Sequence, residues 1–187
     1  MNTAFCTIFA GPRRVARVAD SYAASMARQI LADDPAARVL VFDEAGRQVD
    51  LDFRDEAHES ATGAAPPAPA AETRGRGRPK LGVVAREVTL LPRHWDWLNA
   101  QPGGASVALR KLVENARREN AESDRRREAR EAAYRFLSAI AGDLPGFEEA
   151  SRALFAGDRA RFAENVSGWP GDVAAHARWL AFREGEP

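Results

Sequence analysis

The sequence lacks most of the residues and patterns from which disulfide frameworks, metal centres and membrane spans are built. Cys6 is the only cysteine among 187 residues, which excludes disulfides within the chain and a cysteine-rich metal site. No apolar run approaches the roughly 20 residues that span a bilayer, so we expect no membrane contact and a cytoplasmic location. With three histidines and no glycine-rich phosphate loop after a strand, the chain is predicted to be no enzyme and to use no cofactor.

The chain also lacks a net charge. Its 27 basic and 27 acidic residues give a formal net charge of +0 at pH 7. Proteins that bind nucleic acid over their whole surface are usually basic, so any such contact here must be local. Hydrophobic residues make up 45% of the chain, which is enough to bury a core.

Residues 1–54 predict a small ββαββ domain, so the fold class is expected to be α+β. "TAFCTIFAG" and "RRVARV" predict a hairpin, and "DSYAASMARQILADD" predicts a helix with Asp20 as a candidate N-cap. "VLVFD" and "QVDLDF" predict two more strands. Asp50 and Asp52 fall on one side of the last strand, where they could hold a cation, but alternation favours a solvent-facing edge. Cys6 is expected to be a packed thiol.

Residues 55–80 predict a disordered linker. The stretch "DEAHESATGAAPPAPAAETRGRGR" has almost no large apolar side chain and is rich in alanine, proline and glycine. Such a composition cannot contribute to a core, and "PPAPA" favours an extended polyproline II conformation.

The end of this linker carries cations on alternate residues, namely Arg74, Arg76, Arg78 and Lys80. "RGRGRPK" resembles the AT-hook, a minor-groove arm built on an Arg-Gly-Arg-Pro core. Glycine lets the backbone enter a groove only about 6 Å wide, and arginines favour the negative potential of narrow A·T-rich grooves. The resemblance implies that Arg76 and Arg78 contact A·T-rich DNA. The alternative is a basic linker with no ligand.

Residues 81–120 predict a strand followed by two helices. "VVAREVTLLP" alternates as a strand does, and Pro92 suits the first position of a helix because its missing N–H is not needed there. "QPGG" predicts the end of this helix. "ASVALRKLVENARREN" predicts a second helix with Ser106 as candidate N-cap and an apolar stripe through Leu112 and Val113.

This order of elements, and "GASVALRKLVE" above all, resembles the ribbon-helix-helix DNA-binding domain over residues 83 to 118. The resemblance implies a homodimer, because the strand of one protomer pairs with its mate and the two-stranded ribbon lies in the major groove. It places Arg86 and Thr89 on the ribbon. It also implies that the first turn of the second helix, with Ser106 and Arg110, lies near phosphates.

The sequence leaves the phase of this strand open. If Val88 and Leu90 point to the core, Glu87 and Thr89 face DNA. If the phase is reversed, Arg86 faces DNA beside Val88 and Leu90.

Four stretches over nearly the full length resemble a bacterial family known only as a domain of unknown function. They are "VLVFDEAGRQVDLDF", "GRPKLGVVAREVTLLPRHWDWL", "GGASVALRKLV" and "LPGFEEASRALFAGD". The resemblance implies a continuous fold and brings no activity, catalytic residue or cofactor.

Residues 121–187 predict a helical region. "RRENAESDRRREAREAA" is charged all round and predicts a solvated helix. "FEEASRALFAG", "DRARFAENVSG" and "VAAHARWLAF" predict shorter helices, the second of them capped by Asp158. Asp172 and His176 lie four residues apart, a spacing that metal ligands use, but without a third ligand a surface ion pair is the better interpretation. The predicted core residues are Phe147, Leu154, Phe155, Phe162, Val166, Trp169, Trp179 and Leu180.

These patterns predict a homodimeric DNA-binding protein that acts as a transcriptional regulator. The alternative is a non-enzymatic protein-interaction module, in which the helical region binds another protein and the basic arm merely joins two domains.

Overall fold

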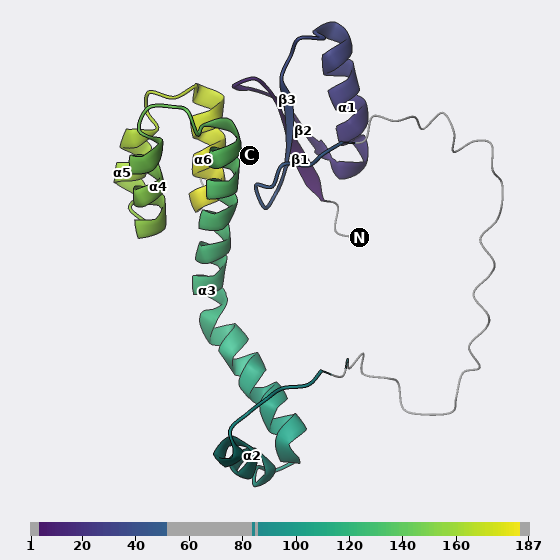
Figure 1. The fold of residues 1–187 in the computed structure, drawn as a ribbon, viewed down its shortest axis with the longest axis vertical. Coiled ribbons are helices and arrows are strands. Elements are labelled where there is room, and N and C mark those ends of the chain that lie inside the picture. The colour runs from purple at the N-terminus through teal and green to yellow at the C-terminus, as the bar shows by residue number, and fades with distance from the viewer. Residues whose placement is uncertain (1–3, 52–83, 85, 184–187) are drawn as a thin grey trace, which may run out of the picture. The chain divides into compact units, whose positions relative to one another are not determined.

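The computed structural model describes residues 4–51, 84 and 86–183 and shows a mixed α+β protein (Figure 1). The strands are β1 (Phe5–Ala10), β2 (Arg13–Ala19) and β3 (Val39–Asp43). The helices are α1 (Asp20–Asp33), α2 (Pro92–Asn99), α3 (Gly104–Ile140), α4 (Phe147–Ala156), α5 (Arg159–Asn165) and α6 (Gly171–Phe182). The chain divides into two compact units, one formed by residues 1–54 with 120–187 and the other by residues 55–119.

The first unit contains a three-stranded antiparallel sheet in the order β2-β1-β3. The predicted hairpin of β1 and β2 is confirmed, with a bulge between Ile8 and Phe9. The prediction of a fourth strand is wrong for the described part of "QVDLDF", where Gln48 makes only an isolated bridge to Phe42. After this bridge the chain turns its apolar side chains toward the sheet, so that Val49 packs into the cluster on the α1 side.

Helices cover both faces of this sheet (Figure 1). On one face, Cys6, Ile8 and Val41 pack against Ala23 and Ala27 of α1. The other face is covered by α3 and α6. The hydrophobic cluster between this face and the helices includes the buried residues Phe9, Leu40, Phe42, Ala133, Phe136, Leu137, Ala177 and Leu180. Because alternate strand residues point to opposite faces, a short sheet can supply both clusters. The N-terminal strands and the C-terminal helices, which the sequence pattern assigns to separate domains, therefore share one core.

An aromatic cluster lies at the centre of the larger core. The ring centroids of Phe9 and Phe136 are 5.3 Å apart, and that of His176 lies 4.7 Å from Phe136 and 5.4 Å from Trp179. Such contacts stabilise the packing beyond the area that they bury. They hold β1 against α3 and α6.

His176 belongs to this core, so the expectation of a surface ion pair with Asp172 is wrong. The side chain is only 1% exposed, and neither ring nitrogen has a hydrogen-bond partner among the described residues. Asp172 instead accepts a hydrogen bond from the backbone N–H of Arg14 at 2.9 Å. Burial, followed by the nearby cations Arg14, Arg17 and Arg183, lowers the pKa of His176 from 6.5 to about 4.

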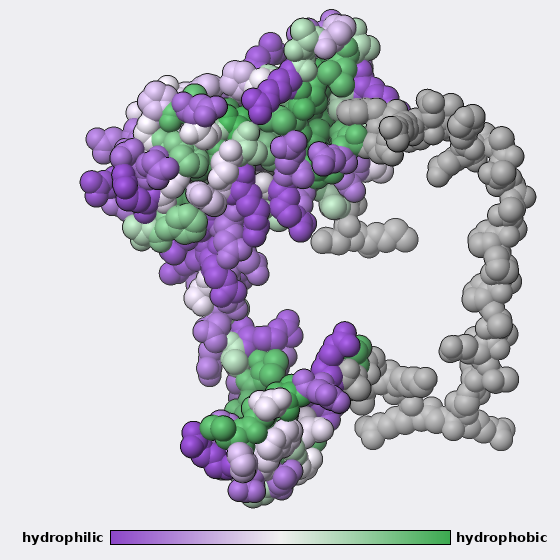
Figure 2. Space-filling view, in the orientation of Figure 1, coloured by the Kyte–Doolittle hydropathy of each residue, from purple (hydrophilic) through white to green (hydrophobic). Residues whose placement is uncertain are grey.

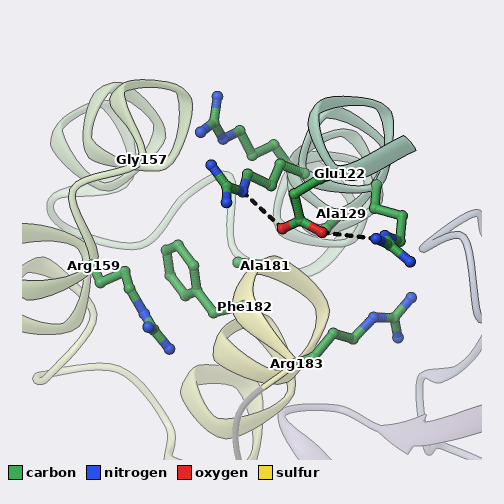
Figure 3. A pocket seen from close by; sticks show the side chains of 10 residues that line it. Glu122, Ala129, Gly157, Arg159, Ala181, Phe182 and Arg183 are labelled. Atoms are coloured by element: carbon green, nitrogen blue, oxygen red, sulfur yellow. Dashed lines mark hydrogen bonds and ion pairs between the residues drawn. The ribbon is translucent and has the colours of Figure 1, made fainter. Parts of the chain in front are cut away.

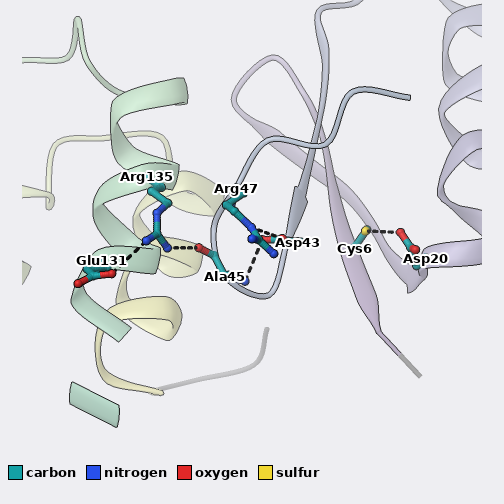
Figure 4. Close-up of polar contacts among 7 residues, drawn as sticks. All are labelled: Cys6, Asp20, Asp43, Ala45, Arg47, Glu131 and Arg135. Atoms are coloured by element: carbon teal, nitrogen blue, oxygen red, sulfur yellow. Dashed lines mark hydrogen bonds and ion pairs between the residues drawn. The ribbon is translucent and has the colours of Figure 1, made fainter. Parts of the chain in front are cut away.

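Two of the expected helix caps have different outcomes. The cap of α5 is confirmed, because the Asp158 carboxylate accepts a hydrogen bond from the Arg161 N–H at 3.0 Å. Asp20 is not a cap, because α1 begins at this residue and Ala19 occupies the N-cap position. The Asp20 carboxylate instead accepts a hydrogen bond from the Cys6 thiol at 3.3 Å (Figure 4). Burial, with this contact, raises the pKa of Cys6 to about 12, and the buried side chain confirms the prediction of a packed thiol.

Six of the eight predicted C-terminal core residues are buried, and Phe147 is partly buried against them. Phe155 is the exception. Phe155 is 50% exposed, and its ring lies 5.3 Å from that of Tyr134 on the surface of α3. The sequence pattern misses this because Phe155 and Leu154 are adjacent on α4 and only one of them can face inward.

The turn after β3 docks on α3. The Asp43 carboxylate accepts hydrogen bonds from the N–H groups of Ala45 and Arg47, both at 2.9 Å, and the side chain of Arg135 donates to the carbonyl of Ala45 at 3.2 Å (Figure 4). Gly46 is buried in this turn with a φ of 70°. A Cβ atom at Gly46 would lie 1.9 Å from the backbone oxygen of Ala132, so only glycine permits this approach.

We expect Gly46→Ala to lower the free energy of unfolding by at least about 2 kcal/mol, because the added methyl would push the turn away from α3. Gly11→Ala is the matched control, since Gly11 has a φ of 56° but a Cβ atom there would have no neighbour within 4 Å. The control should show only the conformational cost of about 1 kcal/mol. Urea unfolding of both variants measures the difference, and equal losses would contradict the close docking.

We expect His176 to make the fold sensitive to acid. Its folded pKa is depressed, so its stabilising effect is complete above about pH 6.5 and is lost as the pH falls toward 4. The expected loss in the free energy of unfolding is about 3 kcal/mol. His176→Phe keeps a ring of similar size and should abolish this part of the loss, as urea unfolding near pH 7 and near pH 4 would show. An unchanged pH dependence in the variant would refute the assignment to His176.

Candidate nucleic-acid interface

The segment before α2 belongs to no helix or strand in the single chain. Arg86, Glu87, Val88 and Thr89 are all exposed, and the exposed fraction of Val88 is 56%. The strand predicted here is therefore absent from the described residues, because no other segment of them pairs with it. Arg86 and Thr89 belong to opposite sides of an alternating strand, and both are exposed. The single chain therefore favours neither of the two predicted orientations of this segment.

Two glycines set the corner between α2 and α3. Gly103 and Gly104 have φ values of 89° and 74°, in the left-handed region that glycine adopts most readily. A Cβ atom at Gly103 would lie 3.1 Å from the Cβ of Val107, so the corner is tight. Pro92 opens α2, as predicted.

The position of Ser106 differs from the expectation. Because α3 begins at Gly104, Ser106 lies within its first turn and is not its N-cap. Its carbonyl accepts a hydrogen bond from the Arg110 side chain at 3.0 Å, and both residues are exposed. The structure thus brings Ser106 and Arg110 together beside the first N–H groups of α3, which have no partners within the helix.

The unit formed by residues 55–119 buries few of its described apolar side chains. Leu98 and Ala108 are buried, at 3% and 7% exposed. The large apolar residues left exposed are Val84, Val88, Leu91, Trp97, Leu112 and Val113, with exposed fractions between 47% and 70%. Figure 2 shows hydrophobic surface over α2 and the start of α3. The apolar stripe predicted through Leu112 and Val113 is therefore exposed in the single chain.

The remaining predicted site residues, Arg74, Arg76, Arg78 and Lys80, lie outside the described residues. The exposed Trp97 is a candidate contact that the sequence pattern did not single out. The sequence does contain an indication of this exposure. Trp95 and Trp97 are two positions apart on a helix, so they cannot both face the same core.

Two other kinds of feature are absent from the described part of the chain. None of its helices is long and apolar enough to cross a membrane. Residues 4–51, 84 and 86–183 contain no group of three or more His, Cys, Asp or Glu side chains that could hold a metal ion.

Comparison with known proteins identifies a family without an assigned activity. Neither the curated proteins nor the solved structures contain a match. A family model described as an uncharacterised protein conserved in bacteria, DUF2239, matches residues 5–181. This match confirms the resemblance to a bacterial domain of unknown function and extends over both units. The chain belongs to the DUF2239 family.

Proposed function

We propose that the protein is a homodimeric DNA-binding protein that acts as a transcriptional regulator. The observation that carries the proposal is the exposed segment 86–91, which has no strand partner among the described residues and leads directly into a two-helix unit. Segments 86–91 of two protomers would pair with each other as an antiparallel ribbon and lie in the major groove of DNA.

The exposed apolar side chains support a second copy as the partner. Val88 and Leu91 lie in the segment that would form the ribbon, and Trp97, Leu112 and Val113 lie on the helices that follow it. Contiguous apolar surface of this kind usually marks an interface. Two copies related by a twofold axis would each cover the other's patch, which gives a closed assembly from one self-complementary surface.

The charges around this unit support DNA as the ligand. The first-turn N–H groups of α3 and Arg110, whose side chain donates to the Ser106 carbonyl, would form a phosphate contact of the kind that fixes a protein on the DNA backbone. The basic residues Arg74 to Lys80 precede the ribbon in the sequence by only a few positions. An arm in the minor groove beside a reader in the major groove is a combination that homeodomains use.

A protein-interaction module is the second candidate, and Trp97 favours it. An exposed tryptophan is a frequent anchor of protein interfaces. In this case the apolar patch would hold a different protein, and the basic arm would only connect two units.

We expect the protein to shift an A·T-rich duplex in gels at low salt, with affinity that falls steeply as salt rises. Arg76→Ala combined with Arg78→Ala should weaken binding and reduce the slope of log K against log salt by about 2, one for each lost phosphate-proximal cation. The control is Arg13→Ala combined with Arg38→Ala, which removes two exposed cations of the other unit. Absence of any shift at low salt would leave only the protein-interaction candidate.

We expect the chain to sediment as a dimer and Val88→Asp to dissociate it. Placing an unpaired carboxylate in a paired ribbon costs about 3 kcal/mol or more, which corresponds to a weakening of about 100-fold or more. Val15→Asp is the control, because Val15 is a similarly exposed valine, at 43%, on β2 of the other unit. A wild-type protein that stays monomeric at high concentration would refute the ribbon.

A further inference from the structure

Five arginines meet at one pocket in the unit formed by residues 1–54 and 120–187 (Figure 3). Arg125, Arg126 and Arg130 come from α3, Arg159 from the start of α5, and Arg183 from the end of α6. The pocket has a volume of about 560 Å³, within the range of small-molecule sites. Residues far apart in the chain thus converge on one concave surface.

The described lining of this pocket carries an excess of positive charge. Its one carboxylate, Glu122, accepts hydrogen bonds from Arg125 at 2.9 Å and from Arg126 at 3.0 Å. These hydrogen bonds hold the pKa of Glu122 below its ordinary value. Even without Arg159, one carboxylate against the four guanidinium groups of Arg125, Arg126, Arg130 and Arg183 leaves a positive potential, which a concave surface concentrates.

Contacts within the protein hold several of these arginines in place. Arg130 donates to the carbonyl of Phe155 at 3.3 Å, and a Cβ atom at Gly157 would lie 2.7 Å from its guanidinium. The guanidinium carbon of Arg159 lies 5.2 Å from the ring centroid of Phe182. Arg183 caps α6 in the left-handed conformation, and its guanidinium carbon lies 4.7 Å from the ring centroid of Trp179. Cations fixed in this way lose little entropy when they bind an anion.

Other charged places in the same unit lack this imbalance. A second pocket of about 500 Å³ pairs Arg152 and Arg161 with Glu149 and Asp158, so its lining is neutral. On α3 itself, Arg127 has Asp124 as its partner at 3.0 Å. The surplus of arginine is therefore a property of the first pocket and not of every basic stretch of the chain.

We infer that this pocket binds a small phosphorylated molecule. The planar guanidinium group matches the geometry of phosphate oxygens, and several of them together suit a group with more than one negative charge. Phe182, Ala129 and Ala181 add apolar wall, and Figure 3 shows Phe182 beside Arg159 at the end of α6. The ligand is therefore a phosphate ester with an apolar or planar body, and a nucleotide has both parts. None of these residues takes part in the proposed DNA contact.

Calorimetric titration of the full chain at fixed ionic strength tests this inference, with ADP and inorganic pyrophosphate as probes. We expect saturable binding of about one molecule per chain and higher affinity for ADP, whose base adds contact with Phe182. Arg126→Ala should weaken binding about tenfold or more, since a hydrogen bond between charged groups is lost. Glu122→Gln should strengthen binding, because the carboxylate no longer competes for Arg125 and Arg126.

Arg127→Ala is the matched control, because it removes an arginine of the same helix that does not line the pocket. Its affinity for both probes should equal that of the wild type. Absence of saturable binding by the wild type, or equal weakening by Arg126→Ala and Arg127→Ala, would overturn the inference. So would a loss of binding to A·T-rich duplex in Arg126→Ala as large as its loss of ADP binding, because the arginines would then be DNA contacts. Equal affinity for ADP and pyrophosphate would overturn the role of Phe182.

Discussion

The need to cover both faces of a three-stranded sheet determines much of this protein's organisation. A small sheet exposes two apolar faces, and each must be buried against another element. The helix α1 follows β2 directly and covers one face. The other face carries Phe9, Leu40 and Phe42, and it is covered by α3 and α6, which come much later in the chain. In the sequence, residues 55–119 thus lie between the two segments that form the first unit.

Local sequence signals predict many of the elements in both units well. The glycine turn after β1, the Asp158 cap and the proline that opens α2 each act within a few residues, so the sequence alone reveals them. Contacts between distant segments are not visible in this way. His176 looks like half of a surface pair because Asp172 is four residues away, but its surroundings come from Phe9 and Phe136. The prediction of a fourth strand is wrong for a similar reason, because Val49 packs against the apolar cluster on the α1 side and does not continue the sheet.

The two candidate sites differ in how far the sequence could reveal them. Motif and order of elements are enough to suggest Arg86, Thr89, Ser106 and Arg110, because a ribbon and a helix start are local features. The arginine pocket is invisible at that level. Its α3 members lie in a stretch that predicts a solvated helix, and only the fold brings Arg159 and Arg183 beside them. The spacing of Glu122, Arg125 and Arg126 indicates one helix face but not what lies opposite it.

The helix α3 is stabilised differently along its length, and this difference bears on the partner of the protein. Its final turns are held by tertiary contacts, with Phe136 and Leu137 fully buried. Its middle is exposed and contains pairs of opposite charge three or four residues apart, such as Arg117 with Glu114, which favour helix without burial. Neither effect accounts for the first turns, where Leu112 and Val113 remain exposed. Leucine favours an isolated helix, but Leu112 and Val113 gain no burial there, so their exposure points to a surface that becomes buried on association. Val88 and Leu91 are also exposed, and the segment that carries them has no strand partner among the described residues. The proposed second copy of the chain would cover these side chains and pair with segment 86–91, so the proposal of DNA binding rests on this exposed segment as well as on the basic arm.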